Sequence, residues 1–203
     1  NVVIIGGGVS GLHAATIALG FEANVTILDL NVERLKELDL IFDGKVQTLV
    51  SNAFEIERCV LEADLVIGAV LVPGAKAPKL VSNDLVKRMK PGSVLVDIAI
   101  DQGGCFEDSK ATTHDDPTYK IHNSIFYCVA NMPGSVPNTS TYALTNVTMP
   151  YAKAIANKGW KKAIADDKSL RLGLNVHEGL ITYKAVADAF NLEYTPAEKL
   201  ISA

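Results

Sequence analysis

A glycine-rich segment near the start of the chain has the residue types and spacing of a phosphate-binding turn. Residues 6–11 read Gly-Gly-Gly-Val-Ser-Gly, which fits the pattern Gly-x-Gly-x-x-Gly between an apolar run and a helix-forming run. In this pattern Gly6 allows a tight turn, Gly8 lets the backbone approach a pyrophosphate, and Gly11 lets the helix pack on the strand. The phosphates would meet free N–H groups at the positive end of the helix dipole. The residues expected to bind a dinucleotide are Gly6, Gly7, Gly8, Val9 and Gly11. A structural glycine turn is the alternative.

Polar residues farther along the chain could hold the adenosine half of such a ligand. Asp29 ends the next apolar run, where dinucleotide-binding folds place a carboxylate on the ribose hydroxyls. A carboxylate there repels a 2′-phosphate, so it favours NAD over NADP. Arg34 lies about one helical turn beyond and could sit near the adenosine, which leaves some tolerance of NADP. Ser51 could reach the adenine side, or it could cap the helix expected from Ala53.

A carboxylate and an amide follow two later apolar runs. Asp101 precedes a glycine pair, and Asn131 precedes Met-Pro-Gly. In an open parallel sheet the ligand lies outside the carboxyl ends of the strands, so both side chains would converge near the nicotinamide. Asp101 would be suited to proton handling or to gripping a ligand. The alternatives are a helix or turn cap for Asp101 and a turn residue for Asn131.

The elements that would position these residues alternate along the chain. Apolar runs predict strands at residues 2–5, 24–28, 45–50, 65–71, 94–98 and 125–130. Helical patterns lie at 9–19, 32–42, 53–62 and 83–89, and a long loop is expected from 101 to about 123. Because the strands are apolar almost throughout, we predict an α/β fold with a doubly wound parallel (Rossmann) sheet covered by helices on both faces.

The last third of the chain has a different character. We expect residues 1–137 to form the dinucleotide-binding Rossmann domain and residues 138–203 to form a C-terminal helical segment. Helices are expected at 139–165, 169–174, 182–190 and 196–200, with Pro150 as a break or a helix start. So short a segment rarely builds its own core, so it should pack on the sheet, on a partner chain or on a further domain.

Composition excludes several classes of protein. The 203 residues carry a net charge of −4, with 48% hydrophobic and 21% charged residues. These values fit a soluble globular protein and argue against disorder, a nucleic-acid partner and a membrane span. The three cysteines form no Cys-x-x-Cys pair. We therefore expect a cytoplasmic protein with inert thiols and no metal site.

Four long segments resemble the alanine dehydrogenase family. They are ADLVIGAVLVPGAKAPKLV at 63–81, MKPGSVLVDIAIDQGGC at 89–105, THDDPT at 113–118 and YCVANMPG at 127–134. The resemblance extends over essentially the whole chain. It implies NAD-dependent, reversible oxidative deamination of L-alanine to pyruvate and ammonia, a reaction of amino-acid catabolism. It also implies that the protein is a homohexamer. It also implies that Asp101 lies at the reacting centre, for proton handling or for holding the nicotinamide ribose and substrate. The residues that it places around the nicotinamide are Val70, Ile98, Asn131 and Met132.

The resemblance also implies that the complete protein has a second half. The family has an N-terminal substrate domain that contributes residues binding the substrate, and this chain contains no counterpart to it. We therefore expect the chain to be a fragment, inactive alone, with residues 138–203 belonging to an incomplete substrate domain and exposing apolar surface. The alternatives are a non-catalytic NAD-binding or assembly module and another amino-acid dehydrogenase of the same superfamily.

Overall fold

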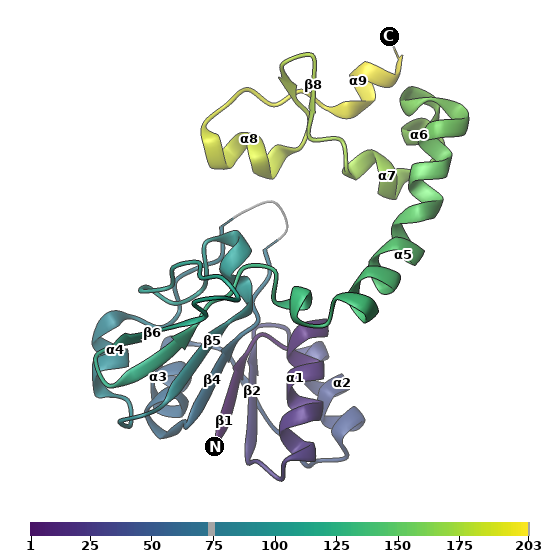
Figure 1. The fold of residues 1–203 in the computed structure, drawn as a ribbon. Coiled ribbons are helices and arrows are strands. Elements are labelled where there is room, and N and C mark those ends of the chain that lie inside the picture. Colours follow the sequence, from purple (N-terminus) through teal and green to yellow (C-terminus); the bar gives the residue numbers. More distant parts are fainter. Residues whose placement is uncertain (73–75, 203) are drawn as a thin grey trace. The chain divides into compact units, whose positions relative to one another are not determined.

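The computed structural model describes residues 1–72 and 76–202, which divide into two compact units (Figure 1). The first unit contains residues 1–72 and 76–132, and the second begins at residue 133.

A seven-stranded sheet, in the order β3-β2-β1-β4-β5-β7-β6, forms the centre of the first unit. Its strands are β1 (Val2–Ile5), β2 (Val25–Asp29), β3 (Gln47–Val50), β4 (Leu65–Gly68), β5 (Val94–Asp97), β6 (Thr118–Ile121) and β7 (Ser124–Tyr127). The pairings are parallel apart from β6 with β7. The chain winds outward from β1 first to β3 and then, beyond β4, in the opposite direction. The doubly wound α/β fold predicted from the sequence is therefore confirmed.

Helices cover both faces of this sheet. They are α1 (Val9–Gly20), α2 (Val32–Phe42), α3 (Ala53–Glu62) and α4 (Asn83–Arg88). Successive residues of β1 point to opposite faces, so Val2 and Ile4 pack with α1 and α2, while Val3 and Ile5 pack with α3 and α4. All four residues are buried, which is why β1 reads as an unbroken apolar run.

Side-chain caps fix where the helices begin. The Asn31 side chain accepts hydrogen bonds from the backbone N–H groups of Glu33 and Arg34 at the start of α2. At the start of α3, Asn52 accepts from Glu55. These oxygens satisfy N–H groups that have no partner within the first helical turn. The bounds predicted for both helices agree with the structure.

The stretch after β5 is more ordered than its sequence indicates. It begins with a short 3-10 helix, η1 (Ile98–Gln102), and includes β6. The prediction of a loop as far as residue 123 was therefore wrong at its end. Thr118 and Lys120 of β6 are exposed, while Tyr119 and Ile121 are half-buried. Such a short, half-polar edge strand lacks the apolar run that marks the central strands.

The second unit begins within η2 (Met132–Ser135) and is mainly helical. Its elements are α5 (Pro137–Lys158), α6 (Trp160–Asp166), α7 (Lys168–Leu172), β8 (Val176–His177), β9 (Leu180–Ile181), α8 (Lys184–Phe190) and α9 (Ala197–Ser202). Pro150 lies inside α5, so the predicted break or helix start there was wrong. The helix instead ends at Gly159, and water can reach the carbonyl that Pro150 leaves unpaired, because α5 is exposed. The β8–β9 hairpin was also missed; Glu178 and Gly179 form its turn at positive φ.

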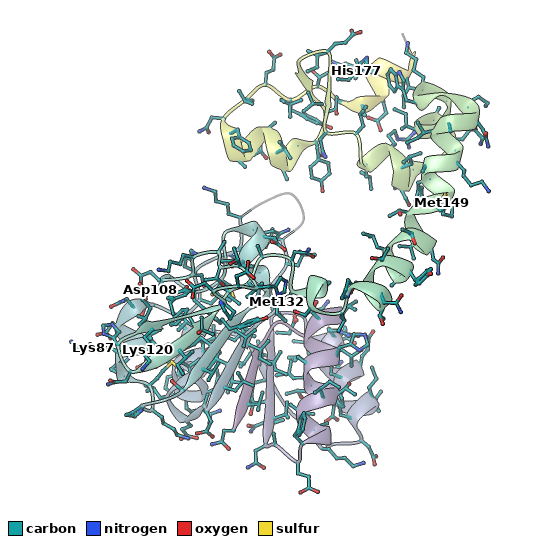
Figure 2. All side chains as sticks on the ribbon, viewed as in Figure 1. Lys87, Asp108, Lys120, Met132, Met149 and His177 are labelled. Atoms are coloured by element: carbon teal, nitrogen blue, oxygen red, sulfur yellow. The ribbon has the colours of Figure 1, made fainter. Side chains whose placement is uncertain are left out.

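Apolar side chains lie exposed along α5. None of its residues is buried, and Tyr142, Val147 and Met149 are exposed (Figure 2 labels Met149). Among the described residues of this unit, the buried apolar ones are mostly small, namely Ala163, Ile164, Ala187 and Ala197. Within residues 1–72 and 76–202, no helix has the length and apolar character needed to cross a membrane.

We expect all three thiols to resist alkylation while the protein is folded. Cys59, Cys105 and Cys128 are buried free cysteines, and their burial raises each thiol pKa. Less thiolate, the reactive form, is then present at mildly alkaline pH. Iodoacetamide labelling followed by mass spectrometry should show slow modification in buffer and rapid modification in denaturant. Rapid labelling of Cys105 or Cys128 in the folded protein would contradict this packing.

Candidate functional site

The parallel register brings the loops that follow the strands to one edge of the sheet. Ile5 at the end of β1 lies opposite Leu28 of β2 and Gly68 of β4, and Gly68 lies opposite Asp97 of β5. The segments after these strands contain the glycine turn and most of the residues predicted to bind a cofactor. The point where the winding reverses lies between β1 and β4, which is where doubly wound sheets bind ligands.

The glycines of the turn differ in the space around each Cα atom. Gly6 has a φ of +107°, and a Cβ there would lie 2.6 Å from the carbonyl oxygen of Ala69 after β4. A Cβ on Gly11 would overlap the Gly6 carbonyl oxygen, so this glycine allows α1 to pack on the turn. Gly8 is different, because a Cβ there would meet nothing within 4 Å. It is the exposed N-cap of α1 and makes no side-chain cap hydrogen bond, which leaves room for a phosphate at the helix N-terminus.

The Gly7 peptide is held from two sides. Its N–H donates to Asp29 Oδ2 at 2.6 Å, and its carbonyl oxygen accepts from Arg34 Nε at 2.7 Å. A Cβ on Gly7 would lie 2.7 Å from Leu38 Cδ1, so the turn also packs against α2. Asp29 and Arg34, both selected from the sequence as adenosine contacts, therefore shape the glycine turn itself.

The other groups around this end of the site have defined partners. Asp29 Oδ1 accepts the N–H of Asn31 at 2.8 Å, and Arg34 Nη1 forms an ion pair with Glu37 at 2.9 Å. Ser51 follows β3, and its N–H donates to the Asp29 carbonyl oxygen at 2.9 Å. Because Asn52 caps α3, the alternative role of Ser51 as that cap was wrong. The Ser51 side chain remains half-buried beside the end of β2.

Residues predicted for the nicotinamide end follow β4 and β5. Val70 and Ile98 are half-buried, and they pack against the apolar clusters on opposite faces of the sheet. Asp101 lies within η1 and is exposed, so its carboxylate can meet a ligand. Asp97 caps η1 by accepting the N–H of Ala99, so Asp101 is not the N-cap of this helix.

Asn131 and Met132 complete this edge after β7. Asn131 has a φ of +59°, a turn conformation that asparagine tolerates, and its carbonyl oxygen accepts from His114 Nε2 at 3.0 Å. The turn role considered for Asn131 is therefore present, while its exposed side chain stays available. Met132 is half-buried at the start of η2 (Figure 2).

Two residues at this edge have roles that sequence reasoning missed. Lys79 Nζ donates to the carbonyl oxygens of Gly103 and Phe106, at 2.7 and 2.8 Å, and so ties down the segment after η1. Asp97 is fully buried. The role of Asp97 could have been suspected from the sequence, because this aspartate ends an apolar run. A carboxylate in a buried strand needs hydrogen-bond donors to offset its desolvation. Among the described residues, no group of His, Cys, Asp or Glu could hold a metal ion.

Comparisons with known proteins place the chain in context. A family model described as "Alanine dehydrogenase/PNT, C-terminal domain" matches residues 1–184. Alanine dehydrogenase from Mycolicibacterium smegmatis is 57% identical over 202 residues, which cover 100% of this chain and 54% of that protein. Alanine dehydrogenase from Staphylococcus haemolyticus is 61% identical over 199 residues, covering 98% and 53%. The chain thus spans about half the length of these curated relatives.

Solved structures agree with this placement. An L-alanine dehydrogenase superimposes with a TM-score of 0.82 at 51% identity, over 94% of this chain and 52% of that one. A transhydrogenase from Sinorhizobium meliloti gives a TM-score of 0.62 at 25% identity, over 70% and 41%.

Two glycines of α1 provide a matched test of the turn. We expect Gly11→Ala to lower the free energy of unfolding by about 1–3 kcal/mol, because the new methyl overlaps the Gly6 carbonyl. Gly20→Ala adds a methyl that meets nothing within 4 Å, so stability should stay unchanged or rise by up to about 1 kcal/mol. Urea unfolding followed by circular dichroism measures both. Equal stabilities would show that α1 does not pack on the turn as described.

Proposed function

The chain belongs to the family of alanine dehydrogenase/PNT C-terminal domains, and from this we propose that it is the NAD-binding part of an L-alanine dehydrogenase. The observation that carries the proposal is the match of residues 1–184 to the family model, together with relatives 57% and 61% identical that bear this name. The reaction proposed for the whole protein is reversible oxidative deamination of L-alanine to pyruvate and ammonia.

The geometry of the glycine turn supports NAD as the cofactor. We assign the pyrophosphate to Gly6, Gly7, Gly8, Val9 and Gly11. The open space at Gly8 and the free N–H groups at the start of α1 suit an anion. Asp29, at the end of β2, would accept the adenosine ribose hydroxyls, and its charge disfavours a 2′-phosphate. Arg34 and Ser51 flank this end of the site.

The nicotinamide would lie at the ends of β4, β5 and β7. We assign its surroundings to Val70, Ile98, Asn131 and Met132. The bound nicotinamide supplies the acceptor for a hydride that leaves the substrate Cα. Asp101, exposed on η1, is the residue we assign to the reacting centre, where its carboxylate would take up a proton or hold the nicotinamide ribose and substrate.

The rest of the substrate site would come from the other half of the protein. In this proposal residues 1–137 are the dinucleotide-binding domain, and residues 138–203 belong to the substrate domain of a cytoplasmic homohexamer acting in amino-acid catabolism. The exposed apolar side chains of α5 support the need for further contacts. Another amino-acid dehydrogenase of this superfamily would share the cofactor site and differ in substrate.

Replacing Asp29 tests the cofactor assignment. Asp29→Ala should weaken NADH binding by about tenfold or more, because it removes a charged acceptor for the ribose and for the Gly7 N–H. Asp29→Asn can keep the bond to Gly7 but removes the charge, so NADPH should gain relative to NADH. Asp39→Ala, on the exposed side of α2, is the matched control. Fluorescence titration measures the NADH affinity of each variant and of the unaltered chain, and the NADPH affinity of Asp29→Asn and of the unaltered chain. NADH binding that Asp29→Ala leaves intact would contradict the assignment.

Turnover tests the proposed reaction. With L-alanine and NAD at alkaline pH, the chain alone should form no NADH, whereas the full-length protein should form it readily. In the full-length protein, Asp101→Asn should lower kcat by about 10²-fold or more, since it removes a group that handles a proton or holds the reactants. Asp115→Asn, another exposed aspartate, serves as the control. Robust turnover by the chain alone would overturn the view that its site is incomplete.

A further inference from the structure

Asp97 is a fully buried carboxylate at the end of β5. Its Oδ1 accepts the N–H of Ala99 at 3.0 Å and the thiol of Cys105 at 3.5 Å. Its Oδ2 accepts the N–H groups of Cys105 at 2.8 Å and Phe106 at 3.3 Å, and also the hydroxyl of Ser109. Burial of a carboxylate is costly unless donors replace the lost water, and these groups do so.

The donors come from a single segment. Residues 99–109 include most of η1, the glycine pair 103–104 and the turn that follows, so one carboxylate gathers the whole loop that presents Asp101. Lys79 also anchors the loop, through the carbonyl oxygens of Gly103 and Phe106. The N–H groups of the loop thus bind the Asp97 carboxylate, and its carbonyl groups bind the Lys79 ammonium.

Glycines allow this close packing. Gly104 has a φ of +75°, and a Cβ there would lie 2.6 Å from Asp97 Oδ2. A Cβ on Gly68, the neighbour of Asp97 across the sheet, would overlap the Cys105 sulfur. The loop therefore rests directly on the carboxylate and on the end of β4, with little room to shift.

We propose that Asp97 is a positioning residue: its carboxylate fixes η1, and with it Ile98 and Asp101, at the nicotinamide end of the cofactor site. The inference rests on the proposed function, because only that function gives η1 a ligand. A purely structural role would differ in one respect. Loss of Asp97 would then weaken every ligand alike, whereas a positioning role weakens only ligands that reach η1.

Asp97→Asn, together with two ligands, separates these roles. The amide can offer one oxygen but must turn its NH₂ toward backbone donors, so part of the loop loses its acceptor. In this proposal NADH reaches η1, whereas ADP lacks both the nicotinamide and its ribose. We expect NADH binding to the chain to weaken by about tenfold while ADP binding changes by less than about twofold. In the full-length protein, kcat should fall further than KM for NAD rises, because misplacement of reacting groups acts mainly on kcat.

Ser93→Ala is the matched control. Ser93 and Ser124 are buried, and their hydroxyl oxygens lie 2.8 Å apart at the opposite end of β5. Both variants should lower Tm by some degrees, but only Asp97→Asn should change the ratio of the two affinities. Equal weakening of NADH and ADP binding by Asp97→Asn, or no weakening of either, would overturn the proposal.

Two further measurements cover other outcomes. If Asp97→Asn does not fold, Ser109→Ala removes a single donor and should shift the ratio of the two ligand affinities in the same direction by a smaller amount. An unshifted ratio would refute the proposal.

If the unaltered chain binds neither ligand, the proposed function has failed. Hydrogen exchange then still decides whether Asp97 fixes η1. Exchange at Ala99, Cys105 and Phe106 should accelerate in Asp97→Asn but not in Ser93→Ala, and unchanged exchange would refute the role.

Discussion

The parallel pairing of β1 with both β2 and β4 is the constraint on which the rest of the structure depends. Parallel neighbours require a crossover after each strand, and here those crossovers are the helices that bury both faces of the sheet. Because the strands run in the same direction, their carboxyl ends lie at one edge of the sheet. A single hydrogen-bonding pattern therefore provides the core and also gathers the glycine turn, Asp29 and η1 at one place.

Two strands at this edge end in the same way. Asp29 closes β2 and Asp97 closes β5, and each carboxylate accepts backbone N–H groups from the loop that it supports. The environments differ, because Asp29 is half-exposed and Asp97 is fully buried. An exposed carboxylate can exchange a protein donor for a ligand hydroxyl, whereas a buried one stays bound to its loop. The first thus suits ligand binding and the second suits the placement of other residues.

The sequence predicted the features that arise from local pattern. The bounds of α2 and α3 were predicted from their helical patterns, whereas the capping roles of Asn31 and Asn52 became evident only in the structure. The glycine turn follows from the needs of a tight strand-to-helix connection. The role of Asp97 could not be predicted in this way, because its donors depend on how residues 99–109 fold back over the sheet. The β6 strand and the β8–β9 hairpin were missed for a related reason: each is too short for periodicity to show and is defined by its partner strand.

The antiparallel strand β6 forms one edge of the sheet. An edge strand offers unpaired N–H and C=O groups that can template the addition of a foreign strand. Here the strand is short and presents an exposed lysine, Lys120 (Figure 2), and the chain turns back directly after it through His122 at positive φ. A charged, abbreviated border of this kind discourages sheet-to-sheet growth and amyloid-like stacking.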